Sequence, residues 1–422
     1  MMIWVILLLG IITYYTIGRR YQSTLLVAMS LYVYWIVARW NIIPITALSL
    51  VITLFGKLLE NRHSKSFVIT PIILIILCFI LLRYSNVGIV LPIGMSVLSF
   101  TGISYLVDQY RNPKHYKSIE VICYLLFFPK IFAGPIERAN NFINSEIRSF
   151  QIANIYKGIK YLIFAAFCKF IIGDIASSTN FEVLGLGLLF QMLTFGISFF
   201  FDFWAYTLMA IGVGELFGYT LSVSFDKPYY AGSFREFWHR WNITLGAWLR
   251  DYIYIPCGGN RLSLPRWSLT VLLVFMVSGL WHGATLPFII WGVFHACLVC
   301  FEKMVVRPQN LPACLRYLYG AIVVLITALL WQLFIVDSME DILLRFGNML
   351  IAAPLEVKPL VQLAVSVVAM VVLTSDRVFN LVRFESTRKR GIITEVTMLS
   401  LMLTTLFILN CPISFNFFYF RF

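Results

Sequence analysis

Residues 267–302 read WSLTVLLVFMVSGLWHGATLPFIIWGVFHACLVCFE, and this stretch decides the fold. It contains two apolar runs, 267–281 and 286–302, which are separated by the WHGATLP segment. Gly283 and Pro287 are residue types that break a helix at this point. A basic residue flanks each end of the stretch, which predicts that both ends lie on the cytoplasmic side of a membrane. We therefore expect a helical hairpin whose tip reaches into the bilayer.

His282 lies at the tip of this hairpin, on backbone that must be buried in protein or line a cavity. An ionisable residue inside a bilayer is energetically expensive, and it marks a functional site by default. Imidazole has a pKa near ~6.5 and can accept a proton from an attacking hydroxyl. The alternative is a packed histidine that is hydrogen-bonded to a backbone carbonyl, and the residue pattern alone leaves both readings open.

The composition of the whole chain agrees with a membrane protein. Of its 422 residues, 60% are hydrophobic and only 13% are charged, and the mean hydropathy is +0.84. Soluble domains carry roughly 25% charged residues. This difference excludes an ordinary soluble enzyme, a disordered protein and a secreted disulfide scaffold. The eight cysteines are scattered, mostly inside apolar runs, and their spacing predicts no metal site.

Apolar runs that are long enough to span or nearly span a bilayer recur along the chain. They lie at 2–17, 23–38, 41–56, 67–82, 87–107, 119–134, 158–173, 183–200, 203–222, 267–281, 286–302, 317–336, 359–375 and 392–410. Runs shorter than ~18 residues favour re-entrant or buried segments. We expect an all-α integral membrane protein with about 11 or more transmembrane helices and re-entrant segments. The sequence predicts one polytopic domain, 1–422.

Basic residues predict the orientation, and they account for the net charge of +13. Eight of them follow the first, third and fifth runs: Arg19, Arg20, Lys57, Arg62, Lys65, Arg111, Lys114 and Lys117. The intervening loops carry only Arg39 and Arg83. Cytoplasmic loops accumulate Lys and Arg. The pattern predicts an extracytoplasmic N-terminus, a cytoplasmic 225–266 stretch and an extracytoplasmic segment 411–422.

The segment SFREFWHRWNITLGAWLRDYIYIPCGGNR, residues 233–261, is dense in Trp, Arg and Tyr. Such a composition is typical of a helix at the membrane interface. That reading explains the aromatic residues well but explains the Arg250–Asp251 pair poorly. The PCGGN sequence at 256–260 predicts a break or a close backbone approach.

Two acidic residues lie inside apolar runs. Asp202 belongs to the sequence FFFDFWAY, and Glu215 follows in the next run. A carboxylate in the membrane needs a partner or a wet cavity. For both residues, a structural ion pair and a catalytic role remain open.

With these motifs in hand, the chain resembles the membrane-bound O-acyltransferase (MBOAT) family, and in particular its bacterial branch with the alginate O-acetyltransferase membrane subunit. The matching segments are LPIGMSVLSFTGISYLVDQYR at 91–111, FPKIFAGPIERANNF at 128–142, FDFWAYTLMAIGVGELFGY at 201–219, EFWHRWNITLGAWLRDYIYIPCGGNR at 236–261 and GLWHGATLPFIIWGVFHA at 279–296. The resemblance implies a helical bundle around a central tunnel that joins a cytoplasmic and an external funnel. It also implies that His282 is the family's near-invariant histidine. His295 matches a further frequent histidine, for which packing is the simpler explanation.

The second family position falls on Asn242, where the bacterial branch usually has His. His239, three residues earlier, occupies what is usually a basic position of the motif. The branch often shows FDFSGYSDMAIG, and here Trp204, Ala205 and Leu208 replace the Ser, the Gly and the second Asp. These departures keep Asp202 but leave the exact acceptor chemistry open.

The resemblance implies an O-acyltransferase in the inner membrane of a bacterial cell, and the pattern of basic residues predicts that both termini lie outside. The expected reaction is O-acetyl transfer from acetyl-CoA toward an exported polysaccharide or cell-wall glycan, without a permanently bound cofactor or metal. We expect an extracytoplasmic acyltransferase as a partner, membrane lipids as surroundings and no nucleic acid. His282 would be the general base, and Asn242 would orient it or polarise the thioester carbonyl.

The resemblance also suggests further site residues. Residues expected to contact the substrates are Asp202, Arg240, Trp241, Arg250 and Asp251. The basic residues Arg235, Arg240, Arg250 and Arg261 would meet the phosphates of coenzyme A. Tyr419, in the terminal FFYFRF, is either an acyl relay or an aromatic anchor at the membrane interface.

Two alternative functions remain at this stage. The first is D-alanyl transfer from a carrier protein to teichoic acid, which the resemblance of the IPCGGNR turn to the acetyl branch disfavours. The second is a non-enzymatic transporter or polysaccharide-export channel in which Asp202 and His282 relay protons. The absence of an inverted repeat in the sequence counts modestly against a transporter.

Overall fold

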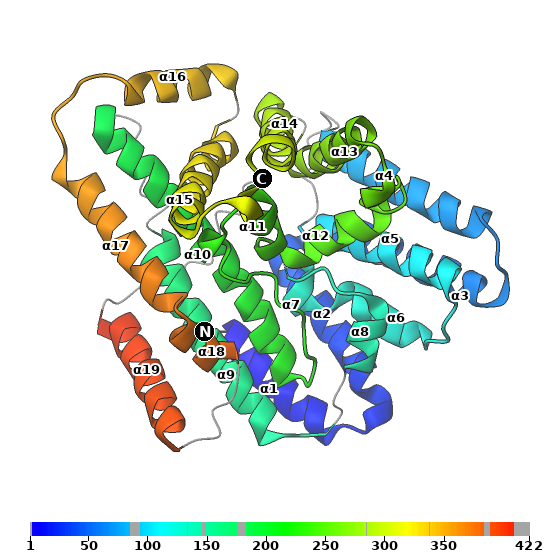
Figure 1. The fold of residues 1–422 in the computed structure, drawn as a ribbon. Coiled ribbons are helices and arrows are strands. Elements are labelled where there is room, and N and C mark those ends of the chain that lie inside the picture. Colours follow the sequence, from blue (N-terminus) through cyan, green and yellow to red (C-terminus); the bar gives the residue numbers. More distant parts are fainter. Residues whose placement is uncertain are drawn as a thin grey trace. The chain divides into compact units, whose positions relative to one another are not determined.

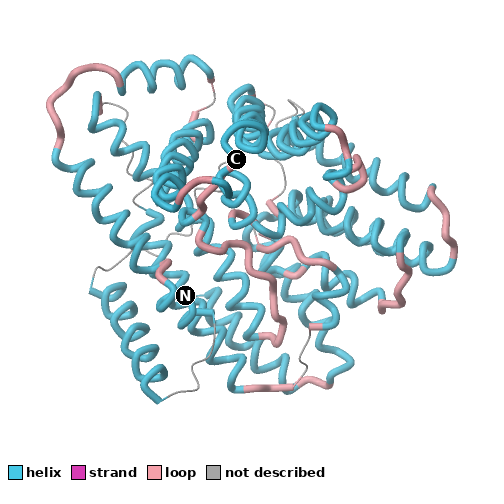
Figure 2. Tube along the Cα trace, viewed as in Figure 1, coloured by secondary structure: helices cyan, strands magenta, loops and turns pink. Residues whose placement is uncertain are grey.

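The computed structural model describes residues 2–84, 93–132, 134–145, 149–174, 183–283, 285–336, 338–383 and 389–408. Every regular element among these residues is a helix (Figures 1 and 2). This result confirms the prediction of an all-helical protein. Two compact units emerge from the packing: Met1–Leu162 with Thr207–Val223, and Ile163–Tyr206 with Ser224–Phe422.

The first unit contains the N-terminal helices. They are α1 (Met2–Thr16), α2 (Gln22–Ala38), α3 (Ile42–Asn61), α4 (Ser66–Tyr84), α5 (Met95–Arg111), α6 (Ser118–Leu126), α7 (Phe128–Ile131), α8 (Ala139–Asn144) and most of α9 (Ile152–Phe167). Helix α3 packs against α4, α5 and α6, and α2 packs against α6. Glycines allow some of these helices to approach closely. A Cβ atom added at Gly56 would lie 2.2 Å from the ring of Tyr105 on α5.

The first unit buries charged residues as well as apolar ones. The Lys130 ammonium lies 3.8 Å from the ring centroid of Tyr124 and 5.2 Å from that of Phe142. The buried Glu137 carboxylate accepts hydrogen bonds from the Ser222 backbone N–H and from its hydroxyl. A buried charge is tolerated only when nearby groups compensate for its lost hydration. Aromatic faces supply this compensation for Lys130, and Ser222 supplies it for Glu137.

The second unit contains the remaining helices. They are most of α10 (Gly185–Leu216), α11 (Phe234–Arg240), α12 (Ile243–Leu249), α13 (Leu264–His282), α14 (Leu286–Phe301), α15 (Ala313–Leu330), α16 (Met339–Met349), α17 (Val357–Leu373), α18 (Asp376–Arg383) and α19 (Lys389–Ile408). Short π-helical segments follow three helices: Cys168–Ile172, Arg250–Tyr254 and Glu302–Val306.

Helix α10 differs from the sequence prediction. Two separate runs, 183–200 and 203–222, were expected, but the structure has one continuous helix of 32 residues. Asp202 interrupts the apolar pattern without breaking the helix, because Lys169 donates to its carboxylate at 2.6 Å. A charge inside an apolar run therefore marks an ion pair here and not a loop.

The helical hairpin predicted for residues 267–302 is present. Helix α13 ends at His282, α14 begins at Leu286, and the two helices pack along each other. Gly279 and Gly292 lie at the contact, where an added Cβ atom would come within 2.4 Å and 2.6 Å of backbone carbonyl oxygens on the opposite helix. Small residues at such contacts let two membrane helices approach closely. This packing fixes the position of His282 at the end of α13.

Five helical stretches among the described residues are long and apolar enough to cross a membrane. They are Arg19–Asn61, Gly185–Leu216, Leu264–His282, Leu286–Asn310 and Ala313–Phe334. Four shorter apolar helices accompany them: Val5–Thr16, Ser66–Leu82, Val357–Leu373 and Ile393–Ile408. The chain therefore has the character of a membrane protein, and the predicted number of crossings stays a prediction.

Candidate functional site

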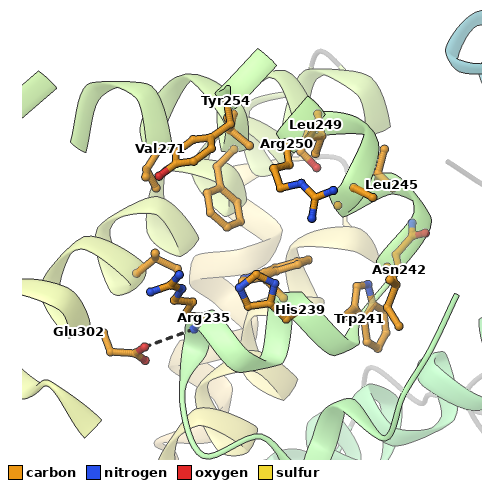
Figure 3. A pocket seen from close by; sticks show the side chains of 18 of the residues that line it. Arg235, His239, Trp241, Asn242, Leu245, Leu249, Arg250, Tyr254, Val271 and Glu302 are labelled. Carbon is orange, nitrogen blue, oxygen red and sulfur yellow. Dashed lines mark hydrogen bonds between the residues drawn. The ribbon is translucent and has the colours of Figure 1, made fainter. Parts of the chain in front are cut away.

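A cavity of about 730 Å³ lies within the second unit (Figure 3). Aromatic residues form one part of its wall: Phe199, Phe203, Trp238, Trp241, Trp267, Phe275, Trp291, Trp331 and Phe334. Polar and charged residues form another part: Arg235, His239, Asn242, Arg250, Tyr254, Asn260, Ser278, His282, Glu302, Lys303, Arg307, Gln309 and Asn310. Trp241, Trp291, Trp331 and Phe334 are buried, whereas five of the basic residues are exposed. The cavity therefore has a basic rim that water can reach and an apolar inner wall.

His282 lies at the aromatic end of the cavity. Its imidazole centroid is 5.0 Å from that of Phe334 and 5.7 Å from that of Trp291. The side chain is partly exposed and lines the cavity. An imidazole held among aromatic rings has few positions to adopt, and it faces the space where a substrate would sit. The structure thus places the leading sequence candidate in a cavity, as a base would require.

Asn242 lines the same cavity from the junction between α11 and α12. Its backbone has φ 41° and ψ 55°, in the left-handed region. Asn is one of the residue types that tolerate this conformation. The turn is fixed by the Ile243 N–H, which donates to the Ser224 carbonyl at 2.8 Å. Asn242 therefore has a backbone role in the turn as well as an amide in the cavity.

The residues expected to contact the substrates fall into two groups. Trp241 and Arg250 line the cavity. Trp241 is stacked on Phe237, with ring centroids 5.5 Å apart, and lies 4.6 Å from Trp331. Its indole is therefore a fixed part of the wall.

Arg240, Asp251 and Asp202 are not among the residues that line the cavity. Arg240 donates to the Glu236 carboxylate at 2.5 Å, and Asp251 accepts from Arg250 Nε at 2.9 Å. Asp202 is fully buried and accepts from Lys169 at 2.6 Å. In each case the charged group has a protein partner, and a substrate contact stays a prediction. Tyr419 lies outside the described residues.

Helix α11 holds the basic rim in place through its first turn. The Ser233 hydroxyl accepts from the Glu236 N–H at 3.0 Å, which caps the helix. The buried Glu302 carboxylate accepts from the N–H groups of Phe234 and Arg235 at 2.5 Å and 3.3 Å. A carboxylate at a helix N-terminus satisfies free N–H groups and interacts favourably with the helix dipole. Glu302 thereby fixes the helix that carries Arg235 and His239.

His239 lines the cavity, although its place in the motif predicted no role for it. Its imidazole rises from α11 and lies between Arg235 and Arg250 in the view of Figure 3. Partial burial lowers the pKa of His239 below its ordinary value, and the charges of Arg235 and Arg250 lower it further. The imidazole is therefore mainly neutral at pH 7.

Glu302 and Lys303 were also missed as site residues. Lys303 is the basic residue that directly follows the apolar run 286–302. The Lys303 ammonium lies 3.6 Å from the ring centroid of Trp267 on α13, so it is held at the rim. Two charged residues at the end of an apolar run are the signal that could have indicated a functional rim.

His295 lies behind the cavity wall. It is fully buried, and its Nδ1 accepts from the Trp238 indole N–H at 3.3 Å. It is not among the residues that line the cavity. A role in orienting Trp238 agrees with the packing explanation. No group of His, Cys, Asp or Glu within the described residues is arranged to hold a metal ion.

Comparison with known proteins adds the family context. Residues 13–336 match the model of the MBOAT, membrane-bound O-acyltransferase family. The probable alginate O-acetylase AlgI of Pseudomonas aeruginosa is 27% identical over 365 residues, covering 78% of this chain and 69% of that protein. The peptidoglycan O-acetyltransferase of Helicobacter pylori is 28% identical over 260 residues, covering 52% of this chain and 49% of that protein. The teichoic acid D-alanyltransferase of Bacillus subtilis is 29% identical over 253 residues, covering 52% of this chain and 62% of that protein. All residues that line the cavity fall inside the family match.

Proposed function

Given that the chain belongs to the membrane-bound O-acyltransferase family and is an O-acyltransferase, we propose that it transfers an acetyl group from acetyl-CoA toward an exported polysaccharide or a cell-wall glycan. The observation that carries this proposal is a cavity that joins a basic rim to His282 and Asn242. Phosphate groups suit the rim, because Arg and Lys bind them with charge-assisted hydrogen bonds. A thioester arm suits the aromatic inner wall.

The chemistry at the inner wall follows from the two side chains. His282 accepts the proton of the acceptor hydroxyl while the hydroxyl oxygen attacks the thioester carbonyl carbon. The Asn242 amide N–H donates to the oxyanion that forms. The C–S bond then breaks, and the leaving thiolate takes the proton from the His282 imidazolium. The thioester is already activated, so the protein supplies only positioning, a base and stabilisation of the oxyanion.

One relative keeps the donor question open. The Bacillus subtilis relative is named as a D-alanyltransferase of teichoic acid, and the corresponding alternative for this chain is D-alanyl transfer from a carrier protein. The family is one of acyltransferases, which excludes the transporter alternative for this chain. Purified protein would be supplied in parallel with labelled acetyl-CoA and with a D-alanyl carrier protein. Turnover of acetyl-CoA alone supports the proposal, and turnover of the carrier alone contradicts it.

Substitutions at Asn242 separate its amide from its turn. Asn242→Gly removes the amide but keeps the left-handed backbone, which Gly adopts freely. We expect this variant to lose about 10²–10³-fold in kcat, the usual cost of removing one oxyanion donor. Asn242→Ala should lose at least as much and also fold less well, because Ala is strained at φ 41°. Normal turnover in Asn242→Gly with a defect only in Asn242→Ala would show that the residue serves the turn alone.

The orientation of the rim is tested by cysteine labelling. We propose that the 225–266 stretch is cytoplasmic and that the donor enters from that side. In a variant without native cysteines, Gly232→Cys and Ser263→Cys should each react with a membrane-impermeant maleimide only in permeabilised cells, where the reagent reaches the cytoplasmic face of the membrane. A separate variant that keeps Cys257 as its one cysteine, exposed in the same stretch, provides a matched third position. Labelling of intact cells at these positions would contradict both the orientation and the side of donor entry.

Tyr419 remains a proposed acyl relay. His282 would deprotonate the phenol, the phenolate oxygen would attack the thioester carbon, and the thiolate would leave with the proton from His282. The tyrosyl ester would then be passed to a glycan hydroxyl by an extracytoplasmic partner enzyme. Tyr419→Phe keeps the ring but removes the nucleophile, so we expect glycan acetylation in cells to fall to background. Normal acetylation in this variant would leave Tyr419 as an anchor.

A further inference from the structure

The basic rim of the cavity includes a histidine, and the charge of a histidine depends on its surroundings. Arg235, Arg250, Lys303 and Arg307 are exposed cations that line the cavity, and His239 lies in the same rim. Among the described residues, none forms a hydrogen bond with the His239 imidazole, so both ring nitrogens are available to a ligand. A histidine between two guanidinium groups is an unusual element for an anion site, because its own charge depends on what is bound.

The charged groups around His239 come from every element at the rim. Helix α11 contributes Arg235 and Glu236, and the Glu236 carboxylate is occupied by Arg240. The π-helical segment contributes Arg250, whose Nε is held by Asp251.

The far side of the rim contributes Glu302, Lys303 and Arg307. The Glu302 carboxylate is occupied by backbone N–H groups of α11. The acidic groups around the rim are thus engaged elsewhere, and the cations dominate the field at His239.

We propose that His239 takes up a proton when a phosphate-bearing acyl donor binds, and that it becomes the third cation of an Arg235–His239–Arg250 site. The proposal rests on the proposed function, because it assumes that the donor is anionic. With the cavity empty, the two arginines repel a proton on the imidazole. A bound phosphate places negative charge beside the ring and offers an acceptor for its N–H, so the charged form becomes favourable. Binding of the donor and protonation of His239 are therefore coupled.

The coupling has a definite direction. The pKa of His239 is lowered in the free protein, and it rises when an anion binds. Proton uptake is largest between the free and bound pKa values, and donor affinity falls through this window as pH rises. One group exchanges at most one proton, so the affinity changes by at most about tenfold per pH unit. Below the free pKa and above the bound pKa, the protonation of His239 does not change on binding. The affinity then no longer varies with pH through this group.

Calorimetry with coenzyme A in buffers of different ionisation enthalpy measures the proton uptake directly. We expect wild-type protein to take up a substantial fraction of one proton per coenzyme A near neutral pH. His239→Gln should take up markedly less, bind more weakly and lose the pH dependence. His239→Lys, a permanent cation, should recover the affinity without proton uptake. His63→Gln, at an exposed histidine of the first unit, is the matched control and should behave as wild type.

Truncated ligands identify the group that His239 senses. Pantetheine, which lacks phosphate, should bind without proton uptake. Uptake with 4′-phosphopantetheine assigns the pantetheine phosphate, which a carrier protein also provides. Proton uptake with coenzyme A but not with 4′-phosphopantetheine assigns the phosphates of the nucleotide end. Uptake with pantetheine equal to that with coenzyme A would overturn the proposal.

The outcomes separate this inference from the proposed function. Equal proton uptake by wild type and His239→Gln, or none by wild type, would overturn the role of His239 even if acetyl transfer is observed. Conversely, proton-coupled binding of coenzyme A without transfer from acetyl-CoA would support the His239 site and overturn the proposed function.

Discussion

Replacing His282 with Ala is expected to abolish acyl transfer while the protein stays folded and membrane-inserted. Loss of a general base costs typically ~10²–10⁴-fold in rate. His282 lines the cavity at its aromatic end, within 5.0 Å of Phe334 between ring centroids. The measurement is release of coenzyme A from acetyl-CoA by purified protein in the presence of an acceptor.

His63→Ala provides the matched control, because it removes an exposed imidazole outside the cavity. It should retain wild-type turnover and yield. If His282→Ala also turned over at the wild-type rate, His282 would be a packing residue, and the mechanism would need another base.

Replacing Lys169 with Met is expected to give the largest loss of stability. Lys169 is 2% exposed and contacts both Asp202 and Asp174 at 2.6 Å, and Asp202 is fully buried. Removing one partner of a buried pair typically costs ~3–5 kcal/mol, because the other charge stays buried without compensation. Asp202→Asn should cost less, since Lys169 keeps Asp174. Thermal unfolding in detergent and the yield of monodisperse protein measure which of the two variants loses more stability.

Lys157→Met is the matched control for this effect. Lys157 also contacts a buried carboxylate, Glu215, at 2.6 Å, but its side chain is 25% exposed. We expect a smaller loss, because water reaches this pair. A Lys169→Met protein that unfolds like wild type but no longer transfers acetyl groups would place Lys169 and Asp202 in the chemistry.

The sequence predicted the fold class and the hairpin because both depend on local patterns. Long apolar runs predict helices, and Gly283 and Pro287 mark the break between α13 and α14. The same logic failed inside α10, where a charged residue in an apolar run suggested a boundary. The partner of Asp202 is Lys169, 33 positions away along the chain, and no local pattern indicates that pairing.

The candidate site was predicted only in part for a similar reason. His282, Asn242, Trp241 and Arg250 could be found from motifs, and the structure brings them to one cavity. Lys303 and Glu302 come to the rim because α14 folds back against α13 and α11, which sequence spacing does not express. Arg240 and Asp251 looked equally suited to a substrate, but their charges are matched by Glu236 and Arg250. The packing of the helices decides whether a charged side chain faces the cavity or another charged side chain.

A cryo-EM structure of the protein with coenzyme A is the most direct test of whether the cavity of the second unit binds the acyl donor. We predict ligand density inside the cavity, with phosphates beside Arg235 and Arg250 and the thiol end toward His282 and Asn242. Density for coenzyme A elsewhere, with this cavity filled by lipid, would show that the cavity is not the donor site.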